Sequence, residues 1–113
     1  MGDFVKIARV GDIRPGQRES YWVEGVKVLV YNIDGTLYAT DDSCPHRQCS
    51  LERAVVNGTT VVCPCHAAQF DVTTGEVLVE PVGFPPTVPI PVHGVKVVGN
   101  DVLVALSSDI DSI

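Results

Sequence analysis

The sequence predicts an all-β fold, and three observations carry that prediction. Apolar and polar residues alternate over residues 21–33, a segment rich in Val, Tyr and Ile, as is typical of half-buried strands. Glycine-containing turn signals recur between short runs of this kind along the chain. No window of about twelve residues keeps a helical period, so we expect little helix.

Each expected strand is bounded by a turn signal. In chain order these signals are Glu24-Gly25, Asp34-Gly35, Asn57-Gly58, Thr74-Gly75 and Gly99-Asn100-Asp101. Asp-Gly and Asn-Gly pairs are strong hairpin signals because both residues reach positive φ at low cost. Short strands separated in this way indicate an antiparallel β-sandwich or barrel.

A proline-rich segment, EPVGFPPTVPIPVHG at residues 80–94, interrupts the β pattern. Proline cannot donate a hydrogen bond to a β-ladder, so we expect a stiff loop that leads into an edge-like strand. A stiff loop without secondary structure can cover a neighbouring site. The final residues, 107–113, are expected to fray.

The bulk properties limit the classes of function. A chain of 113 residues is expected to form one domain, 1–113. Its net charge of −6 argues against nucleic acid and suits a protein partner with a basic patch. We expect no membrane span, because no apolar run approaches about 20 residues, and no signal peptide, so a cytoplasmic location follows.

The stretch from Cys44 to Phe70 holds all four cysteines and two of the three histidines. In a reducing compartment this clustering indicates metal or redox chemistry. Cys44 with His46, and Cys63 with His66, could form two loops that each present one thiolate and one imidazole. A structural zinc site is the competing interpretation, with the ligands Cys44, Cys49, Cys63 and His66.

The pattern C-P-H, sixteen residues and then C-P-C-H resembles the Rieske 2Fe–2S signature. The resemblance implies a Rieske (ISP-like) fold, an antiparallel β-sandwich with a small cluster-binding subdomain. The cluster-binding loops would span about residues 43–50 and 62–70, and the proline-rich loop at about 80–91 would cover them. One 2Fe–2S cluster per chain would be bound, with Cys44 and Cys63 on one iron and His46 and His66 on the other.

The resemblance also suggests roles for residues beside the ligands. In high-potential Rieske proteins, cysteines at the positions of Cys49 and Cys65 form a disulfide, which we favour here over two buried free thiols. Ala68 and Phe70 stand where the respiratory family has hydroxyl-bearing Ser and Tyr. Because hydrogen bonds to the sulfurs raise the reduction potential, we expect a potential toward the low end of the Rieske range.

The remaining candidates concern the surface and the core. The residues expected to tune the cluster or shape the docking surface, besides Ala68 and Phe70, are Arg47, Gln48, Phe84, Pro85 and Pro86. His93 has no metal-ligand spacing and is expected to be a surface or strand histidine. The aromatic residues expected in core or half-buried positions are Trp22, Tyr21, Tyr31 and Tyr38.

By this resemblance the chain is similar to the ferredoxin component of aromatic-ring-hydroxylating dioxygenases. It would carry one electron from an NAD(P)H-dependent flavin reductase to a terminal oxygenase, as a monomer that transforms no substrate itself. Two alternatives remain open at this point: the small subunit of a nitrite reductase system and a zinc-binding structural module.

Overall fold

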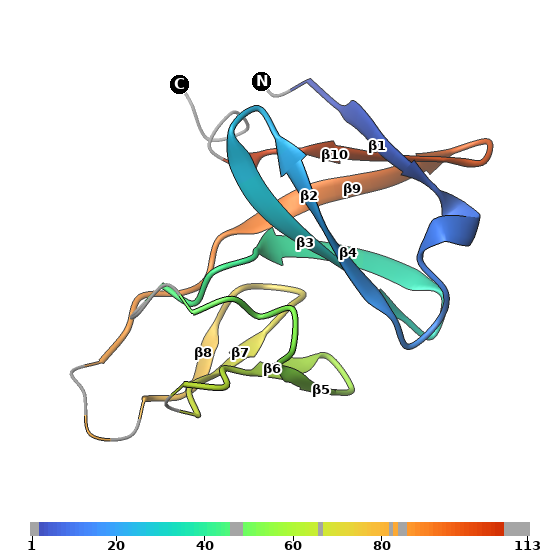
Figure 1. The fold of residues 1–113 in the computed structure, drawn as a ribbon. Helices are drawn as coiled ribbons and strands as arrows, with labels where there is room; N and C mark the ends of the chain where they lie inside the picture. The colour runs from blue at the N-terminus through green and yellow to red at the C-terminus, as the bar shows by residue number, and fades with distance from the viewer. Residues whose placement is uncertain (1–2, 46–48, 66, 82, 84–85, 108–113) are drawn as a thin grey trace.

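The computed structural model describes residues 3–45, 49–65, 67–81, 83 and 86–107, and it consists of two antiparallel β-sheets (Figure 1). The large sheet has the spatial order β1 (Val5–Arg9), β10 (Asp101–Ala105), β9 (Val92–Val98), β4 (Thr36–Asp41), β3 (Val26–Ile33) and β2 (Arg18–Val23). The small sheet has the order β5 (Val55–Asn57), β6 (Thr60–Val62), β7 (Gln69–Asp71) and β8 (Val77–Val79). The predicted all-β fold is confirmed.

Helix is as scarce as the sequence predicts. Within the described residues, one 3-10 turn, η1 (Val10–Asp12), is assigned, and it follows β1 directly. Strand β1 was not among the expected strands, because its five residues carry no turn signal of their own. It forms by pairing with β10, with an irregular register between Lys6 and Ala8.

The hairpins lie where the turn signals predict them. Glu24 and Gly25 take φ values of 49° and 83° in the turn between β2 and β3. Asp34 and Gly35 take 54° and 91° between β3 and β4. Positive φ at both central residues matches the right-handed twist of the flanking strands, so these two turns close tight hairpins.

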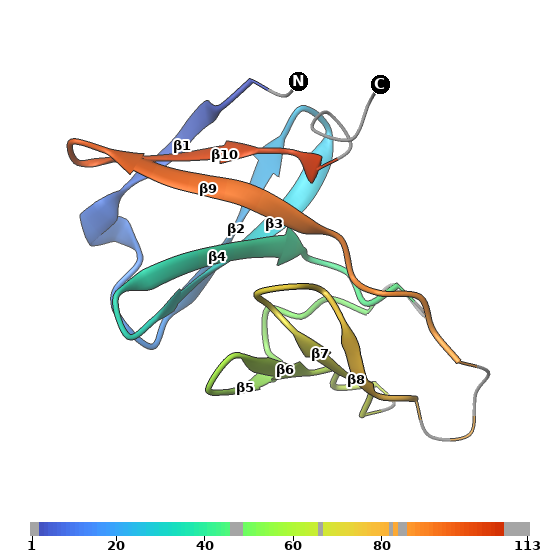
Figure 2. The ribbon, with the colours of Figure 1, turned by 180° about the vertical axis from the view of Figure 1, so that it is seen from behind.

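Strand β3 separates two hydrophobic cores because its side chains alternate between the faces of the large sheet. Val28 and Val30 face one core, in which they join Ile13, Val104 and other residues of the large sheet. The alternate residues, Leu29 and Tyr31, belong to the second core, formed chiefly by the small sheet and the loops beside it. In Figures 1 and 2 the small sheet lies below the large one, and β3 and β4 are the strands nearest to it.

The proline-rich segment connects β8 to β9 and extends beyond the small sheet in both views. Its described part contains no strand before Val92, as expected. The expectation of an edge-like strand was wrong, since β9 lies between β4 and β10 and pairs with both. All the prolines precede residue 92, so every residue of β9 keeps the N–H that a central strand needs.

Gly75 fixes the proline-rich segment against the small sheet. It lies in the β7–β8 turn with a φ of 83°, and its carbonyl accepts a hydrogen bond from the Ile90 N–H at 3.0 Å. A Cβ at residue 75 would collide with the Ile90 carbonyl, so this close approach requires glycine. Ile90 is thereby buried in the same core as Leu29 and Tyr31.

Candidate metal centre

The loop that follows β4 carries the first cysteine pair. Ser43 and Ser50 form an isolated β-bridge, and the Cys44 N–H donates to the Cys49 carbonyl at 2.8 Å. These backbone contacts close the loop at its base. It buries the Cys44 side chain completely, while Cys49 is half-buried.

The loop between β6 and β7 carries the second pair. The Cys63 N–H donates to the Ala68 carbonyl at 2.8 Å, and the Ala67 N–H donates back to the Cys63 carbonyl at 3.1 Å. Ala67 has a positive φ of 61°, which is uncommon for a residue other than glycine and marks a tight turn. Cys63 is 1% exposed, whereas Cys65 is exposed.

A disulfide between Cys49 and Cys65 joins these loops, with a Cα–Cα distance of 6.5 Å, and the predicted pairing is confirmed. The sulfur atoms of Cys49, Cys63 and Cys65 lie within 4.8 Å of one another. Two of these three sulfurs are bonded to each other, so the trio cannot act as three thiolate ligands. The zinc interpretation, which needs the Cys49 thiolate, is incompatible with this disulfide.

Cys44 and Cys63 take no part in a disulfide, and both are buried. Buried thiols presented by two covalently joined loops are suitable ligands for iron. The described half of the expected donor set therefore fits a Rieske cluster. His46 and His66, the other two expected ligands, lie outside the described residues, as do Arg47, Gln48, Phe84 and Pro85.

The surface is hollowed beside each buried thiol. A hollow of about 370 Å³ beside Cys44 is lined by Trp22, Val26, Lys27, Asp41, Ser43, Cys44 and Pro45. A second hollow of about 510 Å³ beside Cys63 is lined by Arg53, Val55, Val62, Cys63, Pro64, Cys65 and Ala67. Both predicted ligand cysteines thus lie directly beneath open surface.

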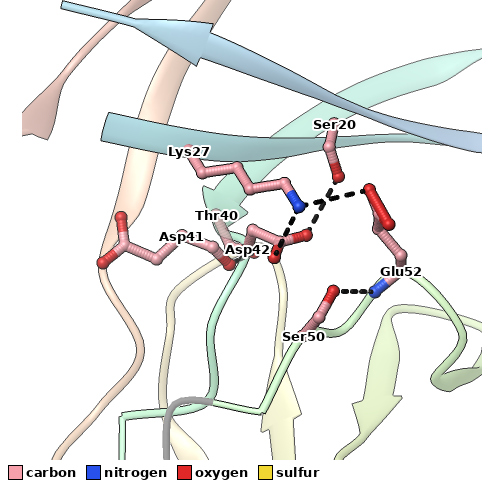
Figure 3. Close-up of polar contacts among 7 residues, drawn as sticks. All are labelled: Ser20, Lys27, Thr40, Asp41, Asp42, Ser50 and Glu52. Carbon is pink, nitrogen blue, oxygen red and sulfur yellow. Dashed lines mark hydrogen bonds and ion pairs between the residues drawn. The ribbon is translucent and has the colours of Figure 1, made fainter. Parts of the chain in front are cut away.

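A polar network ties the first loop to the large sheet (Figure 3). Asp42 is 2% exposed, and its carboxylate accepts a hydrogen bond from the Ser20 hydroxyl at 2.9 Å. The Lys27 ammonium lies 3.7 Å from Asp42 and 3.6 Å from Glu52. The Leu51 N–H donates to the Asp42 carbonyl at 2.7 Å. Because a buried carboxylate must be paired, Asp42 holds β2, β3 and the first loop in one arrangement.

Electrostatics at this junction favour the charged form of Glu52. The neighbouring Ser20 hydroxyl lowers the pKa of the Glu52 carboxyl most, burial opposes this effect, and the nearby Lys27 ammonium lowers the pKa further. Asp41 is not part of this network, and its carboxylate points away from it in Figure 3. The two carboxylates beside Lys27, those of Asp42 and Glu52, offset its positive charge.

Arg18 forms a second connection, between the large sheet and the segment that precedes β5. Its Nε donates to the Glu52 carbonyl at 2.7 Å, and its Nη2 donates to the Ala54 carbonyl. The planar guanidinium can satisfy both carbonyls at once, which an ammonium cannot do in the same geometry. Neither Arg18, on β2, nor Asp42, directly after β4, was predicted, because a single polar residue at such a position gives no spacing signal.

The residues expected to lower the potential lie in the core beside the second loop. Ala68 and Phe70 are fully buried, and neither has a hydroxyl group. Tyr31 belongs to the same core, and its hydroxyl lies 2.9 Å from that of Thr40. Burial raises the pKa of Tyr31 to about 12. Pro86, by contrast, is exposed, as a docking residue would be.

Trp22 contradicts the expectation of core or half-buried packing, because 72% of its surface is exposed. Tyr31 is buried, and Tyr21 and Tyr38 are half-buried, so the expectation holds for these three tyrosines. The strand alternation places Trp22 on the same face as the buried Leu29 and Tyr31.

His93 lies on strand β9, as expected, but its side chain is only 4% exposed, so it is not a surface residue. Its Nε2 lies 2.7 Å from an Asp41 carboxylate oxygen. Its Nδ1 accepts a hydrogen bond from the Ser107 backbone N–H at 2.9 Å. The contact with Ser107 is through the backbone, so these three residues do not form a nucleophilic triad.

A model of the Rieske [2Fe-2S] domain family matches residues 3–92 of this chain. The chain is 35% identical over 105 residues to a biphenyl dioxygenase ferredoxin subunit of Pseudomonas sp. strain KKS102, covering 92% of this chain and 93% of that protein. It is 32% identical over 104 residues to the ferredoxin component of a naphthalene 1,2-dioxygenase system of Pseudomonas putida, covering 92% and 96%.

Solved structures give the same result. The ferredoxin of carbazole 1,9a-dioxygenase from Nocardioides aromaticivorans IC177 superposes with a TM-score of 0.78 at 30% identity, covering 91% of this chain and 97% of that one. A chain from a complex of reduced oxygenase and oxidized ferredoxin in carbazole 1,9a-dioxygenase superposes with a TM-score of 0.75 at 33% identity, covering 90% and 92%. Among the described residues, no helix is long and apolar enough to cross a membrane.

Proposed function

Because this chain belongs to the Rieske [2Fe-2S] domain family, we propose that it is a one-electron carrier that serves a ring-hydroxylating dioxygenase. Its cofactor is a Rieske 2Fe–2S cluster. The observation that carries the proposal is the pair of buried thiols, Cys44 and Cys63, on loops joined by a disulfide. Ferredoxin components of dioxygenases are the relatives that share this length and fold.

The proposed ligands are Cys44 and Cys63 on one iron and His46 and His66 on the other. A cluster of this kind takes up and releases one electron when bound. Two ferric ions, two sulfides and two thiolates have a total charge of zero, and imidazole ligands add none, so reduction is easier than with four thiolates. The buried thiolates keep water from one side of the site, and the imidazoles would face the redox partner.

The proposed donor is an NAD(P)H-dependent flavin reductase, and the proposed acceptor is a terminal oxygenase. A ferredoxin similar to this chain has been solved together with its oxygenase, which supports the acceptor side. The chain would act as a monomeric single domain in the cytoplasm and would not itself transform a substrate. Its acidic surface, with a net charge of −6, suits brief docking to basic surfaces on both partners.

The two alternative functions, a nitrite reductase small subunit and a zinc-binding module, have less support. The relatives named above are dioxygenase ferredoxins, and these do not favour a role as the small subunit of a nitrite reductase system. A zinc module would need the Cys49 thiolate, which the disulfide with Cys65 removes.

The test combines spectroscopy with reconstitution. The dithionite-reduced protein should give the electron paramagnetic resonance signal of a mixed-ligand Rieske centre, and its potential should fall as pH rises. His46→Cys and His66→Cys should each change the spectrum and weaken that pH dependence, because one of the two titratable imidazoles is lost, or should abolish the cluster itself, whereas His93→Gln should leave the signal in place. The ligand assignment is wrong if both ligand variants keep the native spectrum and pH dependence. Failure to reduce any ring-hydroxylating oxygenase in the presence of a reductase would contradict the proposed acceptor.

A further inference from the structure

We infer that Trp22 is an anchor for the terminal oxygenase, inserted into an apolar pocket rimmed by basic residues on that partner. The inference rests on the proposed function and adds the residue and the partner chemistry by which docking would be achieved. It begins from the exposure of Trp22, since 72% of this large apolar side chain faces solvent. Tryptophan is highly buried on average and is enriched at protein interfaces, so this exposure makes Trp22 a candidate contact residue.

The position of Trp22 follows from the alternation along β2. Arg18, Ser20 and Trp22 share the face of the strand that looks toward the small sheet. Arg18 donates to carbonyls of residues 52 and 54, and Ser20 donates to Asp42, which precedes the first cysteine loop. Trp22 is the next residue in this row, and it extends past the last of these contacts. On this face of β2, Arg18 and Ser20 therefore make contacts within the protein, whereas Trp22 is exposed to solvent.

Trp22 also borders the candidate metal centre. It lines the same hollow of about 370 Å³ as Cys44, together with Ser43 and Pro45 of the first loop. A partner that approaches closely enough to exchange an electron through this loop must cover the hollow beside it. A partner docked against the first cysteine loop would therefore contact Trp22 through the same interface.

The charges around the hollow indicate the chemistry of the partner. Trp22 pairs across the ladder with Lys27, and Lys27 lies within 4 Å of both Asp42 and Glu52. Glu24, in the adjoining turn, is exposed, and Asp41 lines the hollow. Among the described residues around the hollow, carboxylates outnumber ammonium groups, and basic groups around an apolar pocket would complement this surface. Arg53 belongs to the other hollow, beside Cys63.

The chain offers a direct probe of this contact, because Trp22 is its single tryptophan. Biosynthetic labelling with 5-fluorotryptophan will give one ¹⁹F resonance from the loaded protein. Addition of a purified oxygenase that this protein reduces should shift or broaden that resonance in a saturable way. Because the partner carries no label, its own tryptophans do not contribute.

Trp22→Ala should raise the Kd for the oxygenase by about tenfold or more, the effect typical of a tryptophan anchor, and Trp22→Phe should recover part of the affinity. Val98→Ala is the matched control, since Val98 is also exposed, at 57%, but lies in the β9–β10 hairpin at the far end of the large sheet from the end of β4 (Figure 1). All variants must first keep the visible spectrum of the cluster. Affinity for the reductase is measured in parallel.

The inference is overturned if the Trp22→Ala variant binds the oxygenase as tightly as the wild type, if the ¹⁹F resonance does not respond at saturation, or if only reductase binding is weakened. These outcomes differ from failure of the proposed function, in which the wild-type protein itself neither binds nor reduces an oxygenase.

Discussion

Cys49 and Cys65 are bonded to each other, so the loop after β4 and the loop after β6 form one covalent unit. Neither loop is held by an extended ladder, since the described backbone bonds within them are few and local. Each loop buries one thiol, at Cys44 and Cys63, and the Cys63 sulfur lies within 4.8 Å of both sulfurs of this bond. The disulfide therefore fixes the separation of the two loops independently of any cluster.

Removal of the disulfide should destabilise the protein and loosen the cluster. The bond closes a loop of 16 residues, so replacing both cysteines, Cys49→Ala with Cys65→Ala, should cost up to about 3 kcal/mol of unfolding free energy. Denaturant unfolding of wild type and double variant measures this difference. The difference should be larger after cluster removal, because a bound cluster itself cross-links the same loops.

A thiol count provides the control for that experiment. Denatured protein, freed of iron and sulfide, should titrate two thiols before reduction and four after it. Four thiols before reduction would mean that the bond is absent in the purified protein, and the double variant would then test only side-chain packing.

Arg18 should contribute to stability through the two carbonyls that it satisfies. Arg18→Ala leaves the carbonyls of Glu52 and Ala54 without this donor, and Arg18→Lys can restore at most one of the two bonds. We expect a loss of about 2 kcal/mol for the alanine variant and an intermediate loss for the lysine variant. Arg14→Ala, at an exposed position, is the control and should change the unfolding free energy little. If all three variants had the unfolding free energy of the wild type, the Arg18 hydrogen bonds would not contribute to stability.

The reduction potential should lie toward the low end of the Rieske range, roughly −150 to +300 mV. Ala68 and Phe70 are buried beside the second loop and offer no hydroxyl to a sulfur atom. Phe70→Tyr should raise the potential by some tens of millivolts, because a hydrogen bond favours the more negative reduced state. Redox titration measures both values, with Phe70→Leu as the hydroxyl-free control. A wild-type potential above about +200 mV on that scale would contradict the prediction.

Much of the fold could be predicted because its signals are local. Positive φ at Asp34 and Gly35 follows from the identity of those two residues. The prolines of residues 80–91 likewise predict that this segment forms no strand. The central position of β9 was missed because strand order depends on pairing between distant segments, which no single segment encodes. Strand β1 was missed for the same reason, since its pairing with β10 defines it.

The candidate site also has some features that local sequence predicts and others that depend on distant segments. The proposed ligand role of Cys44 and Cys63 and the pairing of Cys49 with Cys65 were predicted from the resemblance of their motif to the Rieske signature, and the pairing is confirmed. The exposure of Trp22 was not predictable, because it depends on which distant segments pack over that face of β2 rather than on the pattern within β2. Burial of His93 likewise depends on Asp41, a partner that is 52 positions away.

Tyr31 should make the stability of the protein depend on pH in the alkaline range. Burial raises the pKa of its hydroxyl from 10.0 to about 12 in the folded state, whereas the unfolded chain keeps the ordinary value. The neutral hydroxyl is therefore favoured by folding, and its stabilising contribution is complete below pH 10. As the pH rises from 10 to 12 the unfolded state loses a proton first, so about 2–3 kcal/mol of stability should be lost.

Tyr31→Phe isolates this effect, because other groups that titrate above pH 10 are common to both proteins. The variant loses the hydrogen bond with Thr40 and should be less stable than wild type by about 1 kcal/mol near pH 8. Since it has no phenol to ionise, its deficit should shrink above pH 10 and reverse near pH 12. Denaturant unfolding of the oxidised proteins at several pH values measures the difference. A deficit that stays constant from pH 8 to pH 12 would mean that the Tyr31 pKa is not raised.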